Sequence, residues 1–211
     1  MFGNRGHGMG LAVAAILWGL TTAASAGEGP QHSAGQLYAS LGNTTRAPIG
    51  WVQFCADNPD QCGGGKTQAR DVVMTQTAWR DLQKVNHWVN EKIKPMTDMD
   101  HWGVVEKWSI PTDGYGDCED YALLKRKMLI DAGWPREALL MTVVRDKQGE
   151  GHAVLTVKTD RGEFILDNEN ENVVAWTETG YRYVKRQSQS DPDVWVSLGD
   201  VNPAIATASA R

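Results

Sequence analysis

The chain has 211 residues, of which 41% are hydrophobic and 22% charged, the composition of a globular protein with one compact domain. This excludes a wholly disordered chain, a collagen-like repeat and a multispanning membrane protein. The formal net charge is -5, so the basic surface typical of duplex-binding proteins is not expected, and nucleic acid is not an expected partner.

The N-terminal segment predicts export. Arg5 lies in a short polar start, an apolar run extends from Met9 to Leu20, and Ala24-Ser-Ala26 ends the segment with small residues. These three features are typical of a secretory signal peptide. A membrane anchor is the alternative, but the run is shorter than the ~20 apolar residues needed to span a bilayer. We therefore expect a cleaved signal peptide over 1–26 and no membrane insertion afterwards.

Export permits disulfides, so each of the three cysteines has to be assigned as bridged or free. Cys55 and Cys62 bracket a short segment, whereas Cys118 stands alone. An odd number of cysteines in an exported protein predicts one bridge and one free thiol. The alternative for the close pair is that both cysteines are reduced and partly buried. In either case Cys118 is the thiol left over.

The helices are expected in the first half of the chain. Residues 27–50 are rich in small and polar residues, which predicts a flexible lead-in without regular structure. Apolar residues recur every three or four positions from about Met74 to Ile93, which predicts an amphipathic helix. A long loop is expected over 96–117, followed by a second helix from about Cys118 to Ala132.

The second half is expected to form strands. The candidates are Leu139–Arg145, Ala153–Thr159, Glu163–Asp167, Tyr181–Lys185 and Val194–Leu198. Helices followed by closely spaced strands predict an α+β fold with an antiparallel sheet. A disordered tail is expected over 203–211, which leaves 51–202 as the folded domain.

Cys118 is a candidate nucleophile because it is expected at the N-terminus of the second helix. Free backbone N–H groups and the positive end of the helix dipole favour an anion there, which lowers a thiol pKa. A buried structural cysteine is the alternative, but the flanking Asp117 and Glu119 make the segment polar. A cysteine nucleophile also requires a base.

His152 is the candidate base because of its expected register relative to Asp167. If Asp160-Arg161 forms the two-residue loop of a hairpin, Val154 lies opposite Asp167. His152 shares the face of Val154, so it becomes a diagonal neighbour of Asp167, whereas a slip of one residue would separate them. Each residue alone is more typical of ordinary packing or a turn. Together with Cys118 they predict a Cys-His-Asp triad.

Three motifs together resemble a known family. They are Gly116-Asp-Cys-Glu-Asp-Tyr-Ala-Leu-Leu-Lys-Arg126, Gly151-His-Ala-Val-Leu-Thr-Val157 and Phe164-Ile-Leu-Asp-Asn168. In combination they are similar to the bacterial transglutaminase-like cysteine proteinases, and the resemblance extends from about Trp51 to Leu198. It implies a papain-like, transglutaminase-core fold.

The resemblance also implies roles for individual residues. Cys118 would be the nucleophile, His152 the general base and acid, and Asp167 the residue that orients the imidazole. It implies a calcium requirement, and the family's acidic residues around the cysteine correspond to Asp117, Glu119 and Asp120. Carboxylates beside a thiol oppose thiolate formation, and a hard cation would offset that effect. Helix capping and complementation of the helix dipole are the alternative explanation for these three acids.

The resemblance further implies substrate, partner and location. Members of this family act in the periplasm on the N-terminal retention region of a large biofilm adhesin, under the control of an inner-membrane cyclic-di-GMP receptor. The expected function is therefore that of a calcium-dependent periplasmic cysteine endopeptidase. The alternatives are a transglutaminase or amidase with the same triad, and a non-catalytic calcium-binding interaction module. The intact triad residues count against the non-catalytic module.

Overall fold

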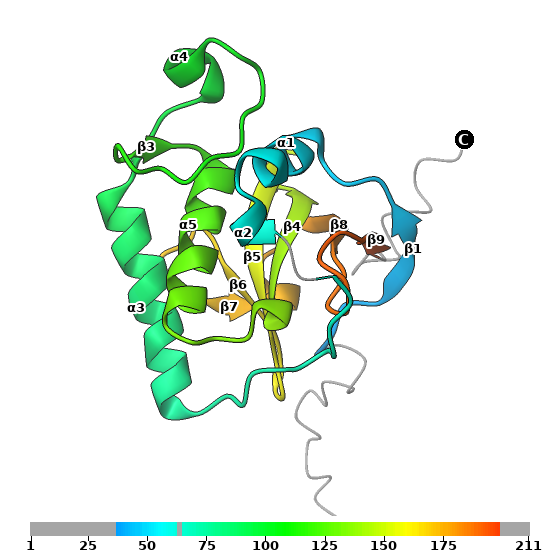
Figure 1. The fold of residues 1–211 in the computed structure, drawn as a ribbon. Helices are drawn as coiled ribbons and strands as arrows, with labels where there is room; N and C mark the ends of the chain where they lie inside the picture. The colour runs from blue at the N-terminus through cyan, green and yellow to red at the C-terminus, as the bar shows by residue number, and fades with distance from the viewer. Residues whose placement is uncertain (1–36, 63–64, 199–211) are drawn as a thin grey trace, which may run out of the picture. The chain divides into compact units, whose positions relative to one another are not determined.

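The computed structural model describes residues 37–62 and 65–198 (Figure 1). The expected signal peptide over 1–26, the first part of the expected lead-in and the expected tail over 203–211 lie outside these described residues. Within the described part of the chain, no helix is long and apolar enough to cross a membrane.

A seven-stranded antiparallel sheet forms the centre of the described chain, with the strand order β1-β9-β8-β4-β5-β6-β7. Its strands are β1 (Leu41–Thr45), β4 (Leu139–Arg145), β5 (Gly151–Thr159), β6 (Gly162–Leu166), β7 (Val174–Ala175), β8 (Arg182–Gln187) and β9 (Trp195–Leu198). Thr159 pairs with Gly162 across the β5–β6 turn, which confirms the predicted two-residue hairpin at Asp160-Arg161. The five predicted strands are all observed, with ends that differ by two residues or fewer.

In the view of Figure 1, α1, α2 and α5 lie in front of the sheet and α3 lies beside α5, whereas α4 lies apart at the top. They are α1 (Ile49–Asp57), α2 (Pro59–Cys62), α3 (Gln76–Lys92), α4 (Asp98–Trp102) and α5 (Cys118–Asp131), with short 3-10 turns at Arg136–Ala138 and Trp176–Glu178. The predicted helices over 74–93 and 118–132 correspond to α3 and α5. Helix α3 begins where the Thr75 side chain accepts a hydrogen bond from the Ala78 backbone N–H.

Apolar side chains fill both faces of the sheet. Helices α1, α3 and α5 bury one set against the sheet, which includes Trp51, Leu82, Leu129, Met141, Leu155 and Trp195. Because side chains alternate along a strand, a second set points to the opposite face, which includes Val144, Val154, Ile165, Trp176 and Tyr183. His152 shares this second face, since it lies two residues before Val154.

Two segments that were expected to lack regular structure contain elements. Residues 41–50 of the expected lead-in contribute β1, which pairs with β9, and the start of α1. The expected loop over 96–117 contains α4 and β3 (Tyr115–Gly116), and β3 pairs in parallel with β2 (Lys94–Pro95). The expectation was wrong here because β1 and β3 are held by partners distant in sequence, which local composition does not show.

The cysteine alternatives are also resolved. Cys55 in α1 and Cys62 at the end of α2 form a disulfide, and Cys118 is the free cysteine among the described residues. Cys62 is buried in the same core as Trp51 and Phe54. The bridge therefore links the short α2 covalently to α1.

Removal of this bridge will lower stability modestly. The double variant Cys55→Ser/Cys62→Ser, made in a Cys118→Ala background to prevent thiol exchange, will lose about 2 kcal/mol of unfolding free energy, because the closed loop is short. Urea unfolding of this variant and of Cys118→Ala alone measures the difference. Identical unfolding midpoints in the two proteins would contradict the prediction.

Candidate active site

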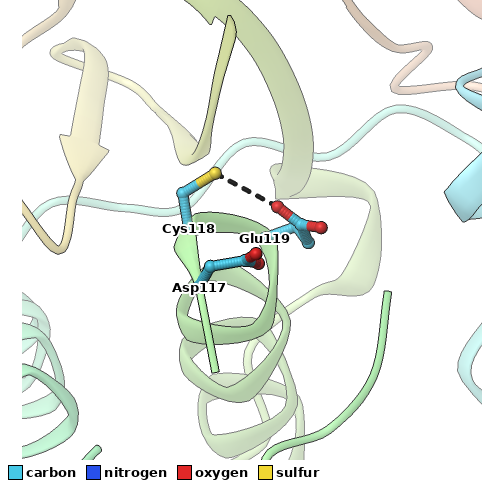
Figure 2. Close-up of side chains that lie close together, drawn as sticks. All are labelled: Asp117, Cys118 and Glu119. Carbon is cyan, nitrogen blue, oxygen red and sulfur yellow. Dashed lines mark hydrogen bonds between the residues drawn. The ribbon is translucent and has the colours of Figure 1, made fainter. Parts of the chain in front are cut away.

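Cys118 is the first residue of α5, with Asp117 at the N-cap position. Its side chain is half-buried, and the thiol donates a hydrogen bond to Glu119 Oε2 at 3.1 Å, as Figure 2 shows. Burial raises the pKa of the thiol well above its ordinary value, and the neighbouring Glu119 carboxylate raises it further. Burial and the Glu119 carboxylate therefore act against the lowering of the thiol pKa that the helix dipole was expected to give.

His152 and Asp167 form a buried pair, as the hairpin register predicted. His152 Nε2 lies 2.9 Å from Asp167 Oδ1, and the residues are 6% and 3% exposed. Burial acts to raise the pKa of Asp167, but the hydrogen bond and charge of His152 outweigh it, and the pKa falls below its ordinary value. Asp167 is therefore the ionised acceptor, and His152 Nε2 donates the hydrogen bond that joins the pair.

The thiol lies against β5 at Ala153, the residue that follows His152. The described β5–β6 pairing extends from the turn only as far as Leu155 opposite Leu166, so β6 has left β5 before Ala153. The backbone N–H of Ala153 instead hydrogen-bonds the Cys118 thiol and favours its ionised form. Because Ala153 directly follows His152, the N-terminus of α5 lies against the segment of β5 that carries the candidate base.

Two asparagines of α3 hold the chain at Asp167. The Asn86 side-chain oxygen accepts from the Asp167 backbone N–H at 3.0 Å, and Asn90 Nδ2 donates to the Asp167 carbonyl at 2.9 Å. Asn86 is fully buried. Neither residue is among those expected from the sequence, although a buried asparagine on the apolar side of a predicted helix is a recognisable signal.

A group of three carboxylates lies close to the nucleophile at the N-terminus of α5. One oxygen each of Asp98, Asp117 and Asp120 lies within 4.8 Å of the other two, and Asp98 and Asp120 are 4% and 0% exposed. Asp117 Oδ1 and Asp120 Oδ2 are buried without a hydrogen-bond partner among the described residues. Unpartnered anionic oxygens that converge in a buried site match the ligands that a hard cation such as Ca²⁺ requires.

Backbone donors hold these acids in place while leaving two oxygens unpartnered. The Lys107 N–H bonds Asp98 Oδ2, and the Ser109 N–H donates to Asp120 Oδ1 at 2.7 Å. Gly116 leaves the room that Asp120 needs, since a Cβ at Gly116 would lie 2.6 Å from Asp120 Oδ2. Burial raises the pKa of Asp117, and that of Asp120 to about 7, and the charges of the neighbouring carboxylates act in the same direction.

The ligand set expected from the sequence is only partly brought together. Asp117 and Asp120 lie together as expected, but the third member of their group is Asp98, which the sequence analysis missed. Glu119 lies in a second group with Asp117 and Cys118, where it accepts the thiol hydrogen bond. The parallel pairing of β2 with β3 brings Asp98 to Asp117, and the Asp98 backbone N–H reaches Asp117 Oδ2 at 3.3 Å.

The arrangement is suited to acyl transfer through a thiol. The Cys118 sulfur, once ionised, can add to a carbonyl carbon, and His152 Nδ1 can take the thiol proton and return it to the leaving amine. Asp167 holds the imidazole by its other nitrogen, which is the division of roles in a Cys-His-Asp triad.

Several solved structures are similar to the chain. Calcium-bound LapG of Legionella pneumophila is 24% identical over 57% of this chain and 71% of that chain, with a TM-score of 0.48. EGTA-treated LapG of the same organism is 23% identical over 59% and 73% of the two chains, with a TM-score of 0.46. A search of curated proteins returned no match.

The family assignment comes from the sequence. The family model described as bacterial transglutaminase-like cysteine proteinase BTLCP matches residues 41–203, which is most of the chain. The matched range contains Cys118, the β5–β6 hairpin and all the acidic residues of the site. The chain therefore belongs to the bacterial transglutaminase-like cysteine proteinases.

Proposed function

We propose that this protein is a calcium-dependent endopeptidase of the periplasm, with Cys118 as nucleophile, His152 as general base and acid, and Asp167 as the residue that orients the imidazole. The observation that carries the proposal is that the free thiol lies at the Ala153 N–H, one residue along β5 from the buried His152–Asp167 pair. A thiol, an imidazole and a carboxylate in this order provide covalent catalysis of peptide hydrolysis.

Calcium is part of the proposal because of the carboxylates grouped near the thiol. Asp98, Asp117 and Asp120 would hold the ion, and Glu119 is close enough to Asp117 to join them. The bound cation would supply positive charge that offsets these carboxylates. Glu119 also accepts a hydrogen bond from the Cys118 thiol, so an ion that Glu119 helps to hold would change the surroundings of the nucleophile.

The substrate, regulator and location in the proposal follow from the family resemblance and the N-terminal segment. We propose that the enzyme resembles LapG in cutting the N-terminal retention region of a large surface adhesin. The periplasmic domain of an inner-membrane cyclic-di-GMP receptor would hold it when the nucleotide is abundant. The signal-peptide pattern over 1–26 supports a periplasmic location.

Cleavage of an adhesin fragment tests the proposal. The purified protein is incubated with the N-terminal fragment of a large surface adhesin from the same bacterium, in calcium and in EGTA, beside the variant Cys118→Ala. We expect cutting in calcium, little cutting in EGTA, and a loss of at least about 10⁴-fold in the variant, because the nucleophile has no substitute.

The other outcomes separate the alternatives. Incorporation of a fluorescent primary amine into the fragment, dependent on Cys118, would indicate a transglutaminase instead of a protease. Absence of cutting by a folded, calcium-loaded protein would contradict the adhesin-protease proposal and favour a binding module. Cutting that is equal in EGTA and calcium would leave the triad in place and remove the calcium requirement.

A further inference from the structure

Tyr181 contacts both members of the buried His152–Asp167 pair, although it belongs to neither motif recognised in the sequence. Its hydroxyl donates a hydrogen bond to Asp167 Oδ2 at 2.6 Å. Its ring meets the His152 ring edge-on, with 5.5 Å between the centroids and 78° between the planes. The residue is 9% exposed, so this hydrogen bond is largely shielded from competing water.

The two oxygens of Asp167 are held by different donors. Oδ1 lies 2.9 Å from His152 Nε2 and accepts the Glu169 backbone N–H at 3.0 Å, whereas Oδ2 accepts the Tyr181 hydroxyl. A carboxylate held at one oxygen can turn about its Cβ–Cγ bond. A second donor on the other oxygen fixes its plane and thereby the direction from which it holds the imidazole.

The local backbone keeps Tyr181 in this position. Gly180 adopts a φ of +73°, which lets the chain turn sharply before β8, and the Tyr181 N–H donates to Thr179 Oγ1 at 3.2 Å. Burial raises the pKa of the Tyr181 hydroxyl, and the hydrogen bond to Asp167 raises it further, so the group remains a proton donor at neutral pH.

We propose that Tyr181 is a positioning residue of the triad: its hydroxyl locks the Asp167 carboxylate, and its ring edge keeps the His152 imidazole turned so that Nδ1 faces the Cys118 thiol. The inference rests on the proposed catalytic roles of these three residues. Tyr181 acts through Asp167 and His152 and touches no reacting atom. Its loss should therefore weaken proton transfer from the thiol without removing the nucleophile.

Tyr183 offers a matched control. It is buried to 3% exposure two residues later on the same face, and its hydroxyl donates to the Trp176 carbonyl at 3.1 Å and lies 3.3 Å from Thr179 Oγ1. The variants Tyr181→Phe and Tyr183→Phe each delete one buried hydroxyl and keep the ring. Only Tyr181→Phe deletes a hydrogen bond to Asp167. An effect that comes from the loss of any buried hydroxyl would therefore appear in both variants.

The test uses two readouts that need no peptide substrate. The first is the rate at which iodoacetamide alkylates Cys118 in the calcium-loaded protein at neutral pH. The second is the NMR signal of the His152 ring N–H, which exchanges slowly with water only while the bond from Nε2 to Asp167 is maintained. In Tyr181→Phe we expect alkylation to be slower by about tenfold, the effect of losing one hydrogen bond to a charged group, and the N–H signal to broaden.

The results separate this inference from the proposed function. In Tyr183→Phe we expect both readouts to stay at the wild-type values. Equal alkylation rates and unchanged N–H signals in Tyr181→Phe and the wild type would overturn the inference, as would the same losses in both variants. Should Tyr181→Phe unfold, 3-fluorotyrosine at position 181 replaces it, and its stronger donor should slow exchange of the N–H. A protein that cuts no adhesin but shows these responses would contradict the function and leave the role of Tyr181 intact.

Discussion

Asp167→Asn will lower kcat by about 10³–10⁴-fold, the largest effect expected from a change that leaves the nucleophile in place. Asp167 accepts three donors, which are His152 Nε2–H, the Glu169 N–H and the Tyr181 hydroxyl. An asparagine amide can keep its oxygen toward His152 while its NH₂ group donates to the Tyr181 hydroxyl oxygen, but it carries no negative charge. The imidazolium that forms when His152 takes the thiol proton then loses the charge that stabilises it.

The measurement is single-turnover cleavage, with Cys118 alkylation as a readout independent of substrate. Glu171→Gln is the matched control, because Glu171 lies on the same loop, and its exposed side chain pairs with the exposed His87. We expect this control to keep activity within about threefold of the wild type. An Asp167→Asn enzyme that retains more than a tenth of wild-type activity would exclude the orienting role of Asp167.

Calcium will raise the melting temperature by about 5–10 °C at a hundredfold excess over its Kd, and the rise will be larger at pH 8 than at pH 5. Burial raises the pKa of Asp120 to about 7 in the metal-free protein, above its value in the unfolded chain. The folded state therefore binds more protons than the unfolded state in this range. The stability that this group contributes is complete at low pH and is lost as the pH rises through about 7.

A cation changes this dependence because it binds the ionised carboxylates and releases their protons. Thermal unfolding in EGTA and in calcium, at pH 5 and pH 8, measures both effects. In Asp120→Asn the remaining oxygen can still accept the Ser109 N–H, while the unpartnered oxygen and its charge are lost. This variant should respond weakly to calcium, and the exposed Asp81→Asn should respond like the wild type. A full calcium response in Asp120→Asn would contradict the assignment of the site.

Both predictions concern charged side chains near the N-terminus of α5, where Cys118 lies. We propose that the Asp167–His152 pair prepares Cys118 for proton loss, and that a cation held by the acids near the thiol would offset the negative charge that opposes it. In the structure the His152–Asp167 pair is formed, and the thiol donates a hydrogen bond to Glu119. A bound ion that draws on these acids would link calcium to the nucleophile and to the fold at the same time.

Much of the framework was predictable from short-range sequence patterns. The apolar period of 3–4 residues predicted α3 and α5, because a helix that buries one face must repeat its apolar residues at that spacing. The Asp160-Arg161 turn predicted the β5–β6 register, and with it the pairing of His152 with Asp167, because a tight turn admits one pairing of its two strands. The free Cys118 at the start of α5 followed from the same helix.

The tertiary structure decided the contacts between segments distant in sequence. Asp98 joins Asp117 because β2 pairs with β3, and Tyr181 reaches Asp167 because Gly180 turns the chain before β8. Glu119 was expected to join Asp117 and Asp120, yet it groups with Asp117 and Cys118, where it accepts a hydrogen bond from the thiol. Periodicity and turn chemistry specify which face a residue occupies within one element. Which residues of different elements meet, and how burial shifts their pKa values, depends on packing of the whole domain, so the charge state of the site could be read only from the folded structure.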